Sequence, residues 1–292
     1  MRINHNIASM ITQSSLYQVN QDMNSSLEKL STGLRINRAS DDAAGLGISE
    51  NLRTQVNGTA QATSNAQDGI ALLNVAEGAA NEVSSILQRM RELAVQSAND
   101  TLTSTERSYT DSEYQALSSE IDRISQVTNY NRQELLGTTA GRFGMNTGAG
   151  SGAVLWVDAN NTVGTDSITI TIDTLTTGAL GLGTFGAAAG AKMSDLTSQT
   201  DAVNAISAVD AAINSVNTMR SDMGAYVNRL QDAINNLNVS NTNQQAAESQ
   251  IRDVDFASET SKFTRDQILQ QSGTAMLAQA NQVPQSVLSL LK

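Results

Sequence analysis

The sequence predicts a mainly α-helical protein: a long antiparallel coiled-coil rod with paired N- and C-terminal helices and a small β-hairpin region in the middle. Three observations support this prediction. Apolar residues recur at gaps of three and four near both ends, proline occurs once, and the pattern stops in a Gly- and Thr-rich middle. Because the seam-forming segments lie at opposite ends of the chain, we expect them to pair, with both termini at one end of the rod.

The N-terminal part contains two helical seams, from Leu16 to Leu34 and from Leu73 to Ala94. Between 100 and 138 the sequence predicts a shorter helix that folds back on the preceding one, with turn and N-cap residues in "NDTLTST". The apolar face of this shorter helix consists of Tyr114, Leu117, Ile121, Ile124 and Thr128.

The most regular pattern lies between 202 and 251. Its seam positions, most of them apolar, alternate strictly at gaps of four and three, which over so many heptads predicts a coiled-coil helix of roughly 75 Å. The first seven positions are Ala202, Ile206, Val209, Ile213, Val216, Arg220 and Met223.

The middle, about 139 to 198, changes character. "SITITIDTL" alternates apolar and polar residues as a half-buried strand does, and "VLWVDANNTVGTD" supplies a second strand and a turn. We interpret this region as a small β-hairpin insertion that carries no chemistry.

Composition excludes several functions. The net charge is −11 and no run of lysine or arginine occurs, so we expect neither nucleic acid nor an anionic membrane as a partner. Cysteine is absent and His5 is the only histidine, so HExxH cannot be written. We therefore expect no enzyme activity and no catalytic, cofactor or metal site.

Residues 30 to 49, "LSTGLRINRASDDAAGLGIS", interrupt two helical segments. The stretch is too specific in composition for a plain linker, so we interpret it as a contact elbow. Acidic residues at the start of the next helix cap free amides and complement its dipole. The candidate elbow residues are Leu34, Arg35, Ile36, Arg38, Asp41 and Asp42.

An apolar stripe continues to the C-terminus in "AMLAQANQVPQSVLSLLK". A terminus frays unless something covers it. Because seam-forming segments lie at both ends of the chain, we expect the N-terminal residues to cover part of the stripe. The stripe and its candidate cover consist of Ile3, Ile7, Ile11, Leu269, Met276, Val283, Val287 and Leu290.

Several long stretches resemble bacterial flagellins. "SLEKLSTGLRINRASDDAAGLGISE", "ALLNVAEGA" and "QRMRELAVQSAND" are similar to the N-terminal region of that family, and "IRDVDFASETSKFTRDQILQQSGTAMLAQANQVPQSVLSLLK" to its C-terminal region. The resemblance covers roughly residues 1 to 138 and 199 to 292. It implies a subunit that polymerises into the flagellar filament for motility and is secreted by type III export, with a filament that is extracellular or periplasmic.

The resemblance also implies layers. Residues 1–42 and 253–292 would form an inner layer that lines the filament channel, and 43–138 and 199–252 an outer core. Residues 139–198 would be the β-rich variable region. Neighbouring subunits would cover the rest of the C-terminal stripe, so the eight residues of the stripe and its cover would form the polymerisation seam. Implied partners are other copies of the chain, an export chaperone at the C-terminal segment, and the filament cap and junction proteins.

One surface in the family binds the flagellin-sensing Toll-like receptor of vertebrates. The matching positions are Gln88, Arg89, Glu92, Leu93 and Glu113. Ordinary rod surface is the simpler interpretation of these residues. A hook–filament junction protein is the main alternative to a filament subunit; an enzyme in the middle region and an adhesin are further ones.

Overall fold

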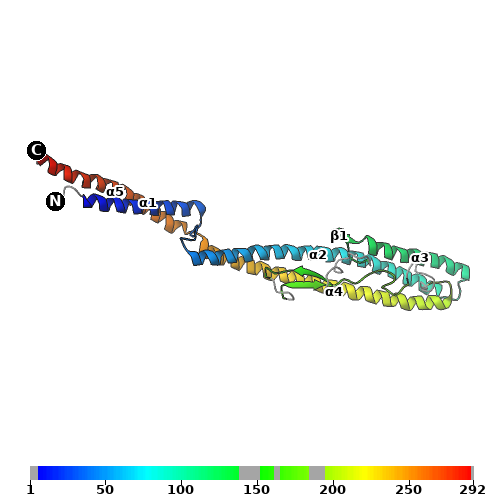
Figure 1. Ribbon diagram of the computed structural model, residues 1–292. Coiled ribbons are helices and arrows are strands. Elements are labelled where there is room, and N and C mark those ends of the chain that lie inside the picture. The colour runs from blue at the N-terminus through cyan, green and yellow to red at the C-terminus, as the bar shows by residue number, and fades with distance from the viewer. Residues whose placement is uncertain (1–5, 138–151, 161–164, 184–194, 291–292) are drawn as a thin grey trace. The chain divides into compact units, whose positions relative to one another are not determined.

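The computed structural model describes residues 6–137, 152–160, 165–183 and 195–290, without the side chains of 283–290. Within these residues it consists of five helices and four short strands (Figure 1). The helices are α1 (Ile7–Thr32), α2 (Ala43–Ser97), α3 (Ser104–Val127), α4 (Gln199–Arg252) and α5 (Phe256–Leu290). The mainly helical prediction is therefore confirmed.

The chain forms two compact units. One contains Asn57–Asn241, and the other combines Met1–Val56 with Thr242–Lys292. The boundaries between these units fall inside α2 and α4. The predicted boundaries between the filament layers fall instead between helices, and the assignment of residues to those layers stays a prediction.

In the Asn57–Asn241 unit, α2, α3 and α4 pack around one apolar core (Figure 1). Every apolar residue of the predicted seam on α2 is buried, with exposed fractions of 0% from Leu73 to Ala94. α3 begins with a capping box, in which Thr103 and Glu106 satisfy each other's backbone N–H groups. The N-cap expected in "NDTLTST" is Thr103.

The α4 seam differs in part from the predicted one. One column, from Ala202 to Leu237 in steps of seven residues, is buried as expected. The second buried column in the first half of α4 is Ala205, Ala212 and Met219. The predicted Ile206, Ile213 and Arg220 are half-buried. Because this part of α4 shares its core with α2 and α3, its buried face is wider than the seam of a two-helix coil.

A short β-hairpin follows α3, where the sequence predicts continued helix. β1 (Asn129–Tyr130) pairs antiparallel with β2 (Gln133–Glu134). Both turn residues have positive φ, 50° at Asn131 and 65° at Arg132, as in a type I′ turn. The usual sequence of that turn is Asn-Gly. Because Arg132 occupies the position of the glycine, the sequence contains no hairpin signal here.

The predicted central hairpin is confirmed. β3 (Ala153–Trp156) pairs antiparallel with β4 (Ser167–Ile170), with Val154 opposite Thr169. Ile168 and Ile170 contribute to the core of the unit.

Two glycines of α2 make a matched pair for a stability test. A Cβ at Gly78 would meet open space, whereas one at Gly58 would lie 2.6 Å from the Cβ and 3.1 Å from the Cα of Ala159. We expect G78A to raise the free energy of unfolding by roughly 0.5–1 kcal/mol, because alanine suits a helix interior better. Overpacking in G58A should lower it by about 1 kcal/mol. Denaturant unfolding of the monomer measures both, and equal effects would contradict this account.

Candidate functional site: the terminal helix pair and the elbow

The two terminal helices pair antiparallel, as the sequence predicts (Figure 1). Asn6 caps α1 by accepting from the N–H of Ser9, and its amide Nδ2 donates to the carbonyl of Ala280 at 2.8 Å. Further along, Gln270 Nε2 donates to Asn20 Oδ1 at 2.8 Å. The start of α1 is thereby tied to the C-terminal half of α5.

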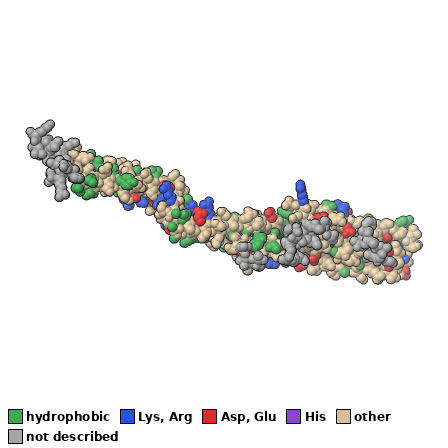
Figure 2. All heavy atoms as spheres, in the orientation of Figure 1, with side chains coloured by type: hydrophobic (Ala, Val, Ile, Leu, Met, Phe, Trp, Pro, Cys, Tyr) green, Lys and Arg blue, Asp and Glu red, His purple; other side chains and the backbone are tan. Residues whose placement is uncertain are grey.

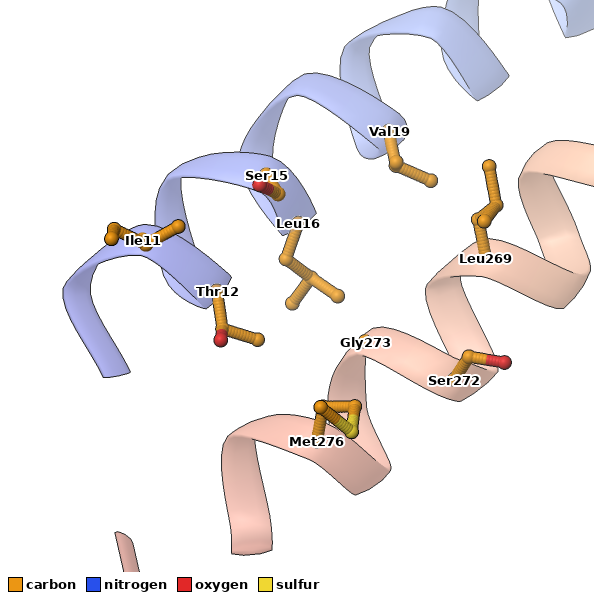
Figure 3. A pocket seen from close by; sticks show the side chains of 9 residues that line it. All are labelled: Ile11, Thr12, Ser15, Leu16, Val19, Leu269, Ser272, Gly273 and Met276. Carbon is orange, nitrogen blue, oxygen red and sulfur yellow. The ribbon is translucent and has the colours of Figure 1, made fainter. Parts of the chain in front are cut away.

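An open groove of about 280 Å³ lies between α1 and α5 (Figure 3). Gly273 allows the close approach, because a Cβ there would lie 2.6 Å from Leu16 Cδ1. The groove is lined by Ile11, Thr12, Ser15, Leu16, Val19, Leu269, Ser272, Gly273 and Met276. It unites three residues of the predicted polymerisation seam, namely Ile11, Leu269 and Met276.

The pair leaves much of its apolar surface uncovered (Figure 2). The exposed fractions of Ile7, Ile11, Leu269 and Met276 are 56%, 62%, 47% and 63%. Among the described residues of this unit, Ile36 is the only apolar side chain that is buried. Two helices alone therefore do not bury their own stripe, and a large exposed apolar surface marks an interaction site.

Four seam residues cannot be placed in the groove. Ile3 lies outside the described residues, as do the side chains of Val283, Val287 and Leu290. Their part in the seam stays a prediction.

The groove also contains six residues that the predicted seam omits, namely Thr12, Ser15, Leu16, Val19, Ser272 and Gly273. Leu16 and Val19 belong to the N-terminal heptad pattern, so their spacing was an available signal. Gly273 was signalled only weakly, by a glycine inside a helical pattern, which often marks a close contact.

Backbone hydrogen bonds join the elbow, which connects α1 to α2, to the short connection between α4 and α5. Gly33 ends α1 in the left-handed conformation, with φ of 75°. Next to it, Leu34 forms an isolated antiparallel bridge with Asp253. The N–H of Arg35 donates to the carbonyl of Arg252 at 2.6 Å, and the N–H of Val254 donates to the carbonyl of Gly33 at 3.0 Å. The α1–α2 connection is thereby joined to the α4–α5 connection.

Both elbow arginines have partners within the chain. Arg35 donates its Nε and Nη2 to the carbonyl of Ile251, at 3.1 and 2.6 Å. Arg38 forms an exposed ion pair with Glu28 at 3.0 Å. The sequence did not indicate a third arginine of the elbow, Arg252, which pairs with Glu50 at 2.7 Å.

The remaining predicted elbow residues order the start of α2. Asp41 accepts from the N–H groups of Asn37 and Arg38, at 3.1 and 3.0 Å. These bonds lower the pKa of its carboxyl below 3.8, Arg38 contributing most. Asp42 accepts from the N–H of Gly45 at 2.9 Å, the capping role expected of it. Ile36 is buried beside them, 2% exposed.

The predicted receptor surface lies on α2 and α3. Arg89 bonds Glu113 at 2.8 Å and Glu92 at 3.0 Å, and these carboxylates, Glu113 first, raise the pKa of Arg89 above its ordinary value. Gln88 is exposed beside them. Leu93 differs from the prediction: it is 1% exposed and packs in the core. The helical period turns it inward, so the surface reduces to the other four residues.

The described part of the chain contains neither a candidate metal site nor a candidate membrane-spanning helix. No group of three or more His, Asp or Glu side chains there could hold a metal ion. Within the same residues, no helix is long and apolar enough to cross a membrane.

The fold and the site define a mainly helical protein whose terminal helix pair leaves an apolar stripe uncovered. Residues 3–140 match the family model for the bacterial flagellin N-terminal helical region, and residues 206–291 the one for the C-terminal helical region. A flagellin of Halalkalibacterium halodurans is 45% identical over 293 residues and is covered fully, as is this chain. The chain therefore belongs to the bacterial flagellin family.

Two further comparisons concern a filament protein and a solved structure. The flagellar filament 33 kDa core protein of Treponema phagedenis is 45% identical over 295 residues, with both chains covered fully. The crystal structure of Bacillus cereus flagellin is 30% identical, with a TM-score of 0.48 over 60% of this chain and 88% of that one.

The Asp41 anchor predicts a local pH dependence. Because the pKa of Asp41 is lowered in the folded chain, the anchor contributes fully above the ordinary value of 3.8 and is lost as the pH falls through the lower, folded-state pKa. We expect the amides of Asn37 and Arg38 to lose their protection from exchange in that acidic range, as followed by NMR. In D41N the same amides should exchange faster at neutral pH. A carboxyl of Asp41 that titrates at 3.8 or above would contradict the prediction.

Proposed function

We propose that the α1/α5 pair is the polymerisation element of this flagellin. As a member of the family, the chain is a structural subunit of the flagellar filament. The observation that supports the proposal most strongly is the uncovered apolar surface along this pair, in a unit with one buried apolar side chain among its described residues.

Neighbouring subunits would supply the missing cover. Fully burying one isoleucine, leucine or methionine contributes roughly 1.5–3 kcal/mol. Ile7, Ile11, Leu269 and Met276 together would therefore contribute several kcal/mol to each contact, which is repeated along the filament. In this proposal residues 1–42 and 253–292 form the inner layer, and residues 43–138 and 199–252 the outer core.

The elbow would form the junction between these layers. Its paired connections hold the two segments at one point, while Leu27, Ile48 and Phe256, exposed by 48%, 53% and 56%, leave apolar surface near it for subunit contacts. The C-terminal segment would bind an export chaperone before secretion, and the filament ends would meet the cap and junction proteins.

Recognition by the flagellin-sensing Toll-like receptor is a secondary role of the free subunit. Gln88, Arg89, Glu92 and Glu113 form one exposed polar patch, and its ion pairs hold the arginine in place before any partner arrives.

Loss of the seam should abolish assembly. We expect a chain lacking residues 275–292 to remain a soluble monomer without filaments, and L269D to raise the critical concentration at least roughly tenfold, because burying an unpaired carboxylate is costly. Electron microscopy and sedimentation measure both outcomes.

The matched control is L269M, which conserves volume and apolar character and should assemble normally. Long filaments from the truncated chain, or from L269D at the unchanged critical concentration, would overturn the proposed role of the pair. Failure of the full-length chain to make long filaments alone would favour the junction protein instead.

The receptor proposal has its own test in reporter cells that carry the vertebrate receptor. Monomeric R89A should need roughly tenfold more protein for half-maximal response, as expected for a central arginine of an interface. The control is R123A, which removes an exposed arginine that pairs with Glu120 elsewhere on α3. Equal responses of the two variants would contradict recognition through Arg89.

A further inference from the structure

The methionines of the described residues differ in their exposure to solvent. Six of the nine in the sequence lie within the described residues. Met90, Met219 and Met223 are 0%, 5% and 1% exposed in the Asn57–Asn241 unit. The terminal helices instead expose Met10 by 59% and Met276 by 63%. The sixth, Met23, is half-buried on α1. Oxidation of a thioether follows its exposure, so Met10 and Met276 are the most accessible of the six.

Met276 differs from Met10 in its surroundings. It lines the groove between α1 and α5, together with Ile11, Leu16 and Leu269 (Figure 3). Met10 is not among the lining residues. A change of polarity at Met276 therefore alters the groove itself, whereas the same change at Met10 leaves the groove lining intact.

The groove contains few hydrogen-bond donors for a polar oxygen. Its three hydroxyls belong to Thr12, Ser15 and Ser272, and both serines are exposed residues. Thr12, one of its lining residues, already donates its hydroxyl to the carbonyl of Ala8 at 2.8 Å. Most of the lining surface comes from apolar side chains. A polar oxygen that is buried here without a donor costs free energy.

We propose that Met276 is a sulfoxidation site through which peroxide controls the assembly of this flagellin. The inference rests on the proposed polymerisation role of the α1/α5 pair. The sulfur lone pair attacks one oxygen of hydrogen peroxide, the O–O bond breaks, an S–O bond forms, and water leaves. Sulfur is oxidised by two electrons and the peroxide is reduced.

Two consequences follow for the subunit. Sulfoxide at Met276 makes the groove polar and raises the critical concentration roughly tenfold. Assembly that covers the groove protects the thioether, so the modification acts on subunits before they enter the filament. Because methionine sulfoxide reductases reverse the reaction, the block is reversible.

The first measurement is the order of oxidation. The full-length monomer is treated with hydrogen peroxide, and peptide mass spectrometry follows each methionine. Met10 and Met276 should be oxidised first, and Met90, Met219 and Met223 at least roughly tenfold more slowly, in line with their burial. Oxidation of the buried three at the same rate as Met276 would overturn the proposal.

The second measurement is assembly after peroxide treatment. The critical concentration of M276L, whatever its value before treatment, should not change on treatment, since leucine cannot be oxidised. M10L is the matched control, which removes an equally exposed methionine outside the groove and should stay peroxide-sensitive. Treatment with both methionine sulfoxide reductases should restore the wild type. Equal loss of assembly in M276L and wild type would overturn the assignment.

A third arm separates this proposal from the function on which it rests. If L269D fails to assemble while Met276-oxidised wild type assembles normally, the polymerisation role stands and the sulfoxidation proposal is wrong. If L269D itself forms filaments at the unchanged critical concentration, the polymerisation role of the pair is overturned, and the sulfoxidation proposal with it.

Discussion

Pairing between the two ends of the chain is the constraint on which the rest of the structure depends. Asn6 and Ala280, joined by a hydrogen bond, lie 274 residues apart in sequence. Closing such a loop costs conformational entropy that the closed contacts must offset. In the Asn57–Asn241 unit, burial of the apolar core between α2, α3 and α4 offsets this cost. In the terminal unit one buried isoleucine, Ile36, contributes little by comparison.

Polar contacts maintain the terminal unit where apolar burial is scarce. The bridge at Leu34 and the ion pair of Arg252 with Glu50 fix the elbow, and Gln270 and Asn20 join the terminal helices. Such contacts are directional and hold geometry, but exposed ones contribute little net stability. A pair built this way keeps its apolar stripe available, as its proposed role in polymerisation requires.

Heptad spacing identified the helices because it depends on local geometry alone. It did not distinguish the Ala205 and Ala212 column from Ile206 and Ile213, because that choice depends on how many helices surround α4. The β1–β2 hairpin was missed for a different reason: its turn uses Arg132 at positive φ where glycine is usual. Leu93 was assigned to a surface from a resemblance, whereas the helical period turns it into the core.

The sequence by itself determined the helices, the pairing of the ends, the central hairpin and membership of the flagellin family, since periodicity and long motifs are properties of the linear chain. Only the tertiary structure decided which stripe remains uncovered. Exposure depends on what packs against each residue, so identical spacing buries Leu87 completely and leaves Met276 63% exposed. The groove beside Met276 exists because Gly273 and Leu16, far apart in sequence, meet there.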